Sequence, residues 1–199
     1  MSSFDSGKKN IVVALCGLIF VIVSLSSAFA GEQLSTISSD QSECQALLLT
    51  NEAYFPALLK AIDKAQSEIF MSMFSFKVGV HKNSYPDRIL GHLAKAVKRG
   101  VKVIAILETT DNRSDELNIQ NRNTGKLLEE KGVQVCFASP YKTTHTKLIV
   151  IDQRLVLLGS HNLTQASMRY NNEASILLDS SELAKRARDY MLTIMKEAK

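Results

Sequence analysis

The sequence predicts an α/β domain in which a mixed β-sheet is sandwiched between helices. Apolar runs of strand length alternate along the chain with segments whose apolar residues recur at helical spacing. Several of these runs are almost continuously apolar, which is typical of strands that are covered on both faces. The chain has 199 residues and no internal repeat, so we expect one domain with a full core.

The first thirty residues are expected to be separate from this domain. Lys8 and Lys9 precede an uncharged apolar run at 11–30, which ends in the sequence Ala-Phe-Ala. This order is typical of a secretory signal peptide. The alternative is an N-terminal anchor that is not cleaved, because the run is long enough to span a bilayer. Small residues near its end favour cleavage, and both alternatives place the rest of the chain outside the cytoplasm, in the periplasm or secreted.

A polar, serine-rich linker at 31–43 is predicted to lead into the domain at 44–199, which opens with alternating helices and strands. Helical spacing of apolar residues indicates a helix at 52–66, and the apolar run 67–76 indicates a buried strand. A second helical stripe lies at 89–97 and is followed by Gly100, a typical helix end. The β-branched run 101–107 then predicts another buried strand.

The second half of the domain continues the alternation. A helix is predicted at 126–131 and a short strand at 133–137, followed by strands in the apolar runs 148–151 and 155–158 and by a further run at 174–178. The last helix is expected to begin at Asp179, with Glu182 completing a capping box. Its predicted core stripe is Leu183, Ala187, Tyr190, Met191 and Ile194. The stretches 77–88, 109–124 and 139–144 lack periodicity and are expected to be loops.

Reactive side chains gather around the two strands that follow position 145. His145 and Lys147 are two residues apart, so they are expected on one face of a strand that Asp152 ends. Ser160 and Asn162 follow the next apolar run. An imidazole, a fixed cation, a hydroxyl and a carboxamide would therefore meet at the ends of adjacent strands, which is the composition of a phosphate site with a reactive group in it.

The spacing His-x-Lys-x₄-Asp from His145, followed by Gly-Ser-x-Asn from Gly159, resembles the phospholipase D superfamily. The chain is similar to its small single-motif members, which include bacterial non-specific endonucleases and short phospholipase D-like proteins. Glu173 resembles the downstream carboxylate of the family, so the resemblance covers roughly 44–199. The family builds its active site from two motifs and this chain has one, so the resemblance implies a homodimer with a shared active site.

The resemblance also implies a metal-independent phosphodiesterase with no cofactor. His145 would attack phosphorus to form a phosphohistidine, and His145 of a second chain would protonate the leaving oxygen. Lys147 and Asn162 would hold the non-bridging oxygens, and Ser160 would donate to the phosphate or to a neighbouring group. Glu173 would accept the second ring N–H of His145. Gly159 is expected to support the site.

Ordinary structural roles compete with these assignments. An isolated histidine or lysine is usually a surface or core residue with no chemical role. Asp152 is as readily explained by a strand-end turn that bonds nearby backbone, and the resemblance gives its counterpart a supporting role. His161 occupies the variable position of the second motif, whereas His81 and His92 have no evident partners in the sequence.

Three functions are compatible with these patterns. The net charge is +4, and removal of residues 1–30 leaves 22 basic and 19 acidic residues, a mildly basic balance that suits a polyanion. The first expectation is an endonuclease acting on DNA or RNA. The second is a phospholipase D that removes head groups from glycerophospholipids, and the third is a non-catalytic nucleic-acid-binding protein for DNA uptake.

The predicted loops bear on the choice among these functions. They are polar, with Tyr85 and Tyr141 as their aromatic residues, and this favours nucleic acid over a membrane surface. Intact His145 and Lys147 argue against binding alone. Candidate substrate contacts in the loops are Lys77, Arg113 and Lys142.

Two cysteines, Cys44 and Cys136, remain outside the first thirty residues. In an oxidising compartment they could form a disulfide that closes a long loop. Two buried thiols are the alternative, because a sequence does not give the separation of the two Cα atoms that a disulfide requires.

Overall fold

The computed structural model describes residues 45–112 and 114–198 of the chain. The predicted signal peptide or anchor at 1–30 and the linker at 31–43 lie outside these residues, as do Cys44 and Arg113. Within the described part, no helix combines the length and the apolar character that a membrane crossing needs.

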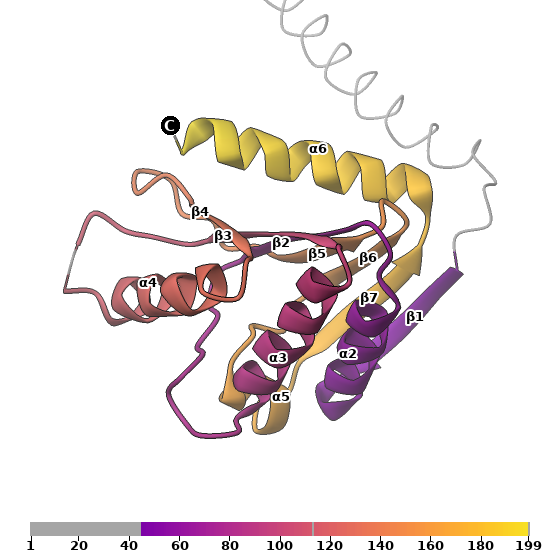
Figure 1. Ribbon diagram of the computed structural model, residues 1–199, viewed down its shortest axis with the longest axis horizontal. Helices are drawn as coiled ribbons and strands as arrows, with labels where there is room; N and C mark the ends of the chain where they lie inside the picture. The colour runs from indigo at the N-terminus through magenta and orange to yellow at the C-terminus, as the bar shows by residue number, and fades with distance from the viewer. Residues whose placement is uncertain (1–44, 113, 199) are drawn as a thin grey trace, which may run out of the picture. The chain divides into compact units, whose positions relative to one another are not determined.

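A seven-stranded mixed sheet forms the centre of the domain (Figure 1), which confirms the predicted fold class. Its strands run in the spatial order β1-β7-β6-β5-β2-β3-β4. The pairs β2–β3 and β3–β4 are parallel, and all other neighbours are antiparallel. The strands are β1 (Gln45–Thr50), β2 (Glu68–Met73), β3 (Lys102–Leu107), β4 (Gln134–Phe137), β5 (Lys147–Ile151), β6 (Leu155–Gly159) and β7 (Ala174–Asp179).

Helices cover both faces of this sheet. In Figure 1, α6 lies along one face, and α2, α3, α4 and α5 lie on the other. The described helices are the 3₁₀ turn η1 (Asn51–Ala53) and the α-helices α2 (Tyr54–Lys64), α3 (Tyr85–Lys98), α4 (Glu116–Glu129), α5 (Gln165–Arg169) and α6 (Ser181–Glu197).

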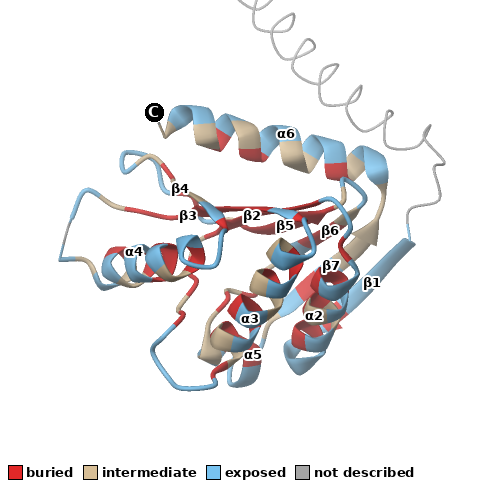
Figure 2. Cartoon of the chain, viewed as in Figure 1, coloured by how far each residue is buried: buried red, intermediate tan, exposed pale blue. Residues whose placement is uncertain are grey.

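The side chains of the central strands divide between two cores, one on each face of the sheet. In β2, Ile69, Met71 and Met73 pack with the helices of the larger layer. Phe70 points the other way and packs against α6, together with Ile104 and Val150 from neighbouring strands. Burial on both faces explains why these strands are continuously apolar in the sequence, and Figure 2 shows them as the buried centre of the domain.

Helix α4 begins at Glu116, so the predicted loop at 109–124 was wrong from residue 116 onward. The buried face of this helix is polar over its first two turns, with Asn118, Asn121 and Thr124 at every third position. Asn121 donates to the carbonyl oxygens of Phe74 (2.8 Å) and Glu108 (2.9 Å), whose backbone leaves the sheet at this point. A helix that satisfies loop backbone instead of burying apolar area carries no hydrophobic periodicity.

The final helix differs from its prediction in its cap and its core stripe. Its N-cap is Ser180, whose hydroxyl accepts from the Leu183 N–H, whereas Asp179 ends β7 and pairs with Arg154 at 2.6 Å. Tyr190 was predicted in the core but is 51% exposed, and Ala184 is fully buried instead. Ala184, Ala187, Met191 and Ile194 share the face that packs against the sheet, and Tyr190 lies outside this face.

Two described elements were not predicted at all. β1 forms one edge of the sheet, and its side chains at Leu47 and Leu48 are mostly exposed, so it lacks the pattern of a buried strand. α5 has five residues, which is too short for helical periodicity to be visible.

The predicted Cys44–Cys136 disulfide includes a residue outside the described part of the chain. Cys136 lies in β4, an edge strand of the sheet, and its pairing with Cys44 stays a prediction.

Candidate active site

The predicted reactive residues lie at the end of the sheet where β5 begins and β6 ends. Lys147 pairs with Met73 of β2, and Gly159 pairs with Ser175 of β7. Leu148 is opposite Leu158 in the antiparallel β5–β6 ladder, so the next residues outward, Lys147 and Gly159, leave the ladder side by side. The two halves of the motif therefore meet at one end of the sheet, as the sequence predicts.

His145 and Lys147 are in direct contact. The Lys147 Nζ atom lies 3.2 Å from His145 Nε2 and donates to the His145 carbonyl oxygen at 2.9 Å. The imidazole is exposed, whereas the lysine is only 8% exposed. A charged lysine can only donate, so Nε2 accepts and the neutral ring carries its proton on Nδ1. No described residue provides a hydrogen-bond partner for Nδ1.

Phe74, which follows β2, forms one wall beside this pair. Its ring centroid lies 4.4 Å from that of His145 and 4.7 Å from Lys147 Nζ. Burial lowers the pKa of Lys147, and the negative charge of Glu173 opposes part of that shift. No sequence pattern singles out Phe74, because it is one more apolar residue at the end of an apolar run.

The segment that carries His145 is fixed on both sides of the histidine. The Thr144 N–H donates to Glu108 Oε2 at 2.6 Å, and the Thr146 hydroxyl is 2.6 Å from that of Ser72. Glu108 is 2% exposed. Burial raises the pKa of this carboxyl, the Thr144 N–H opposes the rise, and nearby Asp115 adds to it. The histidine itself projects from this fixed backbone into solvent.

Glu173 forms a second polar cluster at the same end of the sheet. Its carboxylate accepts hydrogen bonds from the Ser160 hydroxyl, from Ser167 at 2.5 Å and from Asn171 at 3.1 Å. Burial alone would raise the pKa of Glu173, but these hydrogen bonds outweigh burial and hold the pKa below its ordinary value. The carboxylate therefore stays ionised in the folded chain.

The predicted hydrogen bond from His145 to Glu173 is not formed within the single chain. Glu173 lies at the entrance to β7, whereas His145 lies against Phe74 on the β2 side of β5. Two strand spacings separate these positions in the sheet. The hydroxyl of Ser160 does donate to the Glu173 carboxylate. Donation to a neighbouring group was one of the two roles expected for Ser160.

Asn162 brings a partly unsatisfied amide to the site. Its backbone N–H donates to Ser167 Oγ at 2.9 Å, but its side-chain Oδ1 is buried without a hydrogen-bond partner. Ser75 Oγ, in the neighbouring segment after β2, is also buried and unpaired. Buried polar atoms are nearly always paired in folded proteins, so these two atoms, in segments that the Leu163–Ser75 backbone hydrogen bond joins, are unusual.

Gly159 is required by the close approach of β7. A Cβ atom at this position would overlap Ser175 and the backbone of Ala174. The absence of a side chain lets β6 and β7 stay paired up to their last residues, and this pairing places Ser160 beside Glu173. Gly159 thus acts on the position of Ser160 through sterics, and its support of the reaction stays a prediction.

Asp152 lies at the opposite end of β5. Its carboxylate accepts from the backbone N–H groups of Gln66 (2.9 Å), Ser67 (2.7 Å) and Glu68 (3.1 Å), and also from the Ser67 hydroxyl. Burial would raise the pKa of Asp152, but these hydrogen bonds lower it below its ordinary value. This geometry is that of the structural alternative, in which the residue ties a turn to the start of β2.

His161, between Ser160 and Asn162, has a structural environment. Its ring is fully buried and stacks on Tyr54 with centroids 4.2 Å apart. Nδ1 lies 2.8 Å from Ser175 Oγ, and Nε2 lies 3.0 Å from the Asn51 carbonyl oxygen. The same Asn51 accepts the Glu173 N–H at 2.8 Å through its side chain, so this histidine helps to hold the carboxylate segment.

The candidate substrate contacts in the loops do not gather at the active site. Lys77 lines a cavity next to the site, whereas Lys142 is engaged with Glu197 of α6 at 2.9 Å. Tyr85, expected in a loop, opens α3 and packs edge-on against Phe55. Among the described residues, no group of three or more His, Cys, Asp or Glu side chains is arranged to hold a metal ion.

Comparison with known proteins gives a family match and partial matches to longer proteins. A family model described as cardiolipin synthase, PLD-like domain, matches residues 58–195. Polyphosphate kinase from Vibrio vulnificus (strain CMCP6) is 28% identical over 137 residues, which cover 65% of this chain and 19% of that protein. The chain thus spans about a fifth of the length of this relative.

Two solved structures share the fold over nearly their whole length. Nuc from Salmonella typhimurium, described as a phospholipase D family member, has a TM-score of 0.65 and 22% identity, and the match covers 78% of this chain and 96% of that one. NucT from Helicobacter pylori has a TM-score of 0.62 and 20% identity, with 78% and 98% covered. At these identities the likeness establishes the architecture.

Proposed function

The chain is an enzyme of the phospholipase D superfamily, and from this premise we propose that it is a metal-independent phosphodiesterase that acts through a phosphohistidine. One observation carries the proposal. An exposed imidazole, His145, lies 3.2 Å from the buried ammonium of Lys147 at the end of the sheet. A histidine nucleophile beside a fixed cation is suited to attack a phosphate and to stabilise the charge that develops on it.

The proposed mechanism needs two imidazoles, and the described chain has one in this environment. We therefore propose a symmetric homodimer whose two His145 residues face each other across the two-fold axis. The exposed imidazole of His145, whose Nδ1 has no hydrogen-bond partner among the described residues, supports this arrangement. The dimer would enclose one phosphate between two copies of the motif.

The reaction would proceed in two displacements. In the first, Nε2 of one His145 attacks phosphorus, an N–P bond forms and the P–O bond to the leaving group breaks. His145 of the partner subunit gives its proton to the leaving oxygen. In the second, that imidazole takes a proton from water, the water oxygen attacks phosphorus, and the N–P bond breaks to release the phosphomonoester and the free histidine.

Lys147 would change partners when substrate binds. Without substrate, its ammonium donates to His145 Nε2, which occupies the lone pair needed for attack. A non-bridging phosphate oxygen carries negative charge and is a stronger acceptor for the ammonium. Substrate binding would therefore free Nε2 and place Lys147 on the phosphate, with Asn162 as a second donor.

Glu173 would orient the histidine across the dimer instead of within one chain. Its carboxylate is ionised and already fixed by Ser160, Ser167 and Asn171. Oε2 accepts one hydrogen bond and can accept another. We propose that Glu173 of the partner subunit accepts the Nδ1–H of His145, which would hold the ring and stabilise its protonated form.

Nucleic acid is the proposed substrate, DNA or RNA with little sequence preference, after export of the domain to the periplasm or medium. The loops at the active end are polar, and the chain carries a net positive charge. The second candidate is a glycerophospholipid. Leu48, Ile176 and Leu158 are neighbours across β1, β7 and β6 and are 41–64% exposed, so they form an apolar row that could meet a membrane.

Initial rates in EDTA would test this proposal. The purified protein is incubated with plasmid DNA, single-stranded DNA and phosphatidylcholine vesicles, with His145→Asn as the control for contaminating activity. We expect cleavage of nucleic acid that EDTA does not abolish. Faster release of choline would favour the lipid candidate, and binding without turnover would favour a non-catalytic DNA-binding protein. Activity that disappears in EDTA and returns with Mg²⁺ or Zn²⁺ would contradict the mechanism.

A further inference from the structure

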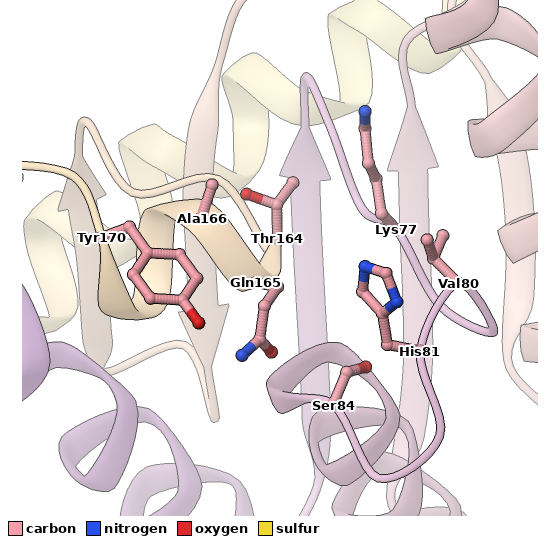
Figure 3. Close-up of a pocket in the computed structure, with 8 residues that line it drawn as sticks. All are labelled: Lys77, Val80, His81, Ser84, Thr164, Gln165, Ala166 and Tyr170. Carbon is pink, nitrogen blue, oxygen red and sulfur yellow. The ribbon is translucent and has the colours of Figure 1, made fainter.

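A cavity of about 320 Å³ lies next to the proposed active site and has no role in the mechanism above (Figure 3). Two segments that are distant in sequence line it. Lys77, Val80 and His81 come from the loop after β2, and Gln165 and Tyr170 come from the α5 region after β6. The volume is at the lower end of the range of small-molecule sites.

Backbone hydrogen bonds connect this cavity to the reactive residues. The Lys77 N–H donates to the Leu163 carbonyl oxygen and the Leu163 N–H to that of Ser75, each at 3.0 Å. Leu163 directly follows Asn162. Phe74, which contacts His145, is three residues from Lys77, a span of at most about 11 Å. The cavity is therefore placed to receive the group attached to a phosphate held at His145.

The lining offers one flat aromatic surface and one oriented donor. Tyr170 is 71% exposed, and Figure 3 shows its ring and that of His81 on opposite sides of the cavity with Gln165 between them. Gln165 Oε1 accepts the Tyr85 N–H at 3.1 Å, which fixes the direction of the amide. Its Nε2 group has no hydrogen-bond partner among the described residues and can donate to a ligand.

The positive charge of the cavity lining favours a nucleotide over a cationic lipid head group. Lys77 is the cation of the cavity, and its pairing with Glu116 is long, at 3.6 Å, with the carboxylate 83% exposed. Such surface pairs contribute little and exchange easily, so the ammonium is available to a phosphate. The same ammonium would repel the cationic head group of a choline or ethanolamine lipid. A flat, neutral base with a phosphate beside it suits the cavity better.

We infer that this cavity binds the nucleoside joined to the scissile phosphate. Its base would stack on Tyr170 and accept a hydrogen bond from Gln165 Nε2, while Lys77 contacts the next phosphate. Stacking uses the face that every base has, and every base edge carries acceptors, so the site would bind all four bases. This role rests on the proposed phosphodiesterase activity. It identifies the nucleoside as the part of the substrate that the cavity recognises.

Small chromogenic diesters test the cavity separately from the chemistry. The probes are thymidine 5′-(p-nitrophenyl phosphate), thymidine 3′-(p-nitrophenyl phosphate) and methyl p-nitrophenyl phosphate, which lacks a base. We expect at least one thymidine ester to have a higher kcat/KM than the methyl ester. The measured quantity is the ratio of kcat/KM for that thymidine ester to kcat/KM for the methyl ester. Tyr170→Ala should lower this ratio roughly 5- to 100-fold, the range expected for loss of one base-stacking contact. Tyr170→Phe keeps the ring and should keep the ratio.

Tyr190→Ala is the matched control, because Tyr190 is also an exposed tyrosine but lies on α6, against the other face of the sheet. It should leave the ratio as in the wild type. Equal kcat/KM for all three esters, or equal ratios in Tyr170→Ala and Tyr190→Ala, would overturn the inference and leave the phosphodiesterase intact. Lack of hydrolysis of every ester would instead contradict the proposed function. A Tyr170→Ala loss confined to phosphatidylcholine would assign the cavity to a lipid head group.

Discussion

The polar side chains at the two ends of β5 differ in whether their hydrogen bonds are completed within the chain. At its start, His145 is exposed with Nδ1 unpaired among the described residues, and Asn162 nearby has a buried, unpaired Oδ1. At its end, Asp152 accepts four hydrogen bonds from the segment that opens β2. We call the Asp152 end of β5 the complete end, because its hydrogen bonds are all made within the chain. The His145 end is the incomplete end, because it has polar atoms without partners in the described part of the chain.

This difference separates stability from function along a single strand. Hydrogen bonds that are complete in the folded chain stabilise it, and their loss is measured as a lower free energy of unfolding. Groups left without partners contribute no such stability, so their presence is better explained by a substrate or a second subunit. The motif spans both ends, although only the first end is expected to take part in the chemistry.

The largest expected effect is at the incomplete end. His145→Asn removes the attacking atom, so we expect kcat/KM on DNA to fall at least about 10³-fold, with the melting temperature unchanged because the ring is exposed. Steady-state rates and thermal unfolding measure the two effects. Activity within tenfold of the wild type would remove His145 from the role of nucleophile.

Lys147 is expected to have the next largest effect. Lys147→Met keeps the length of the side chain but removes the charge that stabilises the phosphate oxygens, so we expect kcat to fall about 10²- to 10³-fold. The variant should not lose stability, because burial already lowers the pKa of this lysine and disfavours its charge. A change in KM with an unchanged kcat would show that Lys147 binds the ground state instead.

Asp152 tests the complete end. Asp152→Ala removes the acceptor of three backbone N–H groups, so we expect a loss of about 1–3 kcal/mol in the free energy of unfolding. Asp152→Asn keeps one acceptor oxygen and should lose less. Both variants should retain kcat at temperatures where they are folded. A large fall in kcat in a stable Asp152→Asn protein would mean that this end is not separate from the chemistry.

The pH dependence of stability gives a smaller effect from the same residue. Hydrogen bonds hold the pKa of Asp152 below its ordinary value of 3.8, so the unfolded chain binds the proton more readily than the folded one. The stabilisation is complete above the ordinary value and is lost as the pH falls through the lower, folded-state pKa. Denaturant unfolding between pH 5 and pH 2 should therefore show a steeper decline for the wild type than for Asp152→Ala.

The fold could be predicted largely from the sequence because most of its strands are buried on both faces. β2, β3 and β5 bury side chains toward both helical layers, and this produces unmistakable apolar runs. The elements that were missed have weak patterns for physical reasons. β1 is an edge strand with exposed leucines, and α4 buries asparagine and threonine instead of apolar side chains.

The site could be predicted as a set of residues but not as a network. The spacing of His145, Lys147, Ser160 and Asn162 placed them at one end of adjacent strands, as the structure has them. The partners of Glu173 were not foreseen, because Ser167 and Asn51 reach it from different elements. Phe74 and the cavity beside it depend on how the loop after β2 pairs with Leu163, which no local pattern encodes.

Subunit mixing shows whether one active site is built from two copies of the incomplete end of β5. Wild-type protein is mixed with increasing amounts of His145→Asn protein, and subunit exchange is verified with differently tagged chains. Hybrid dimers hold one His145 and cannot supply both imidazole roles, so activity should fall below the amount expected from dilution of wild-type chains. A decline strictly proportional to the fraction of wild-type chains, with exchange complete, would contradict the shared site.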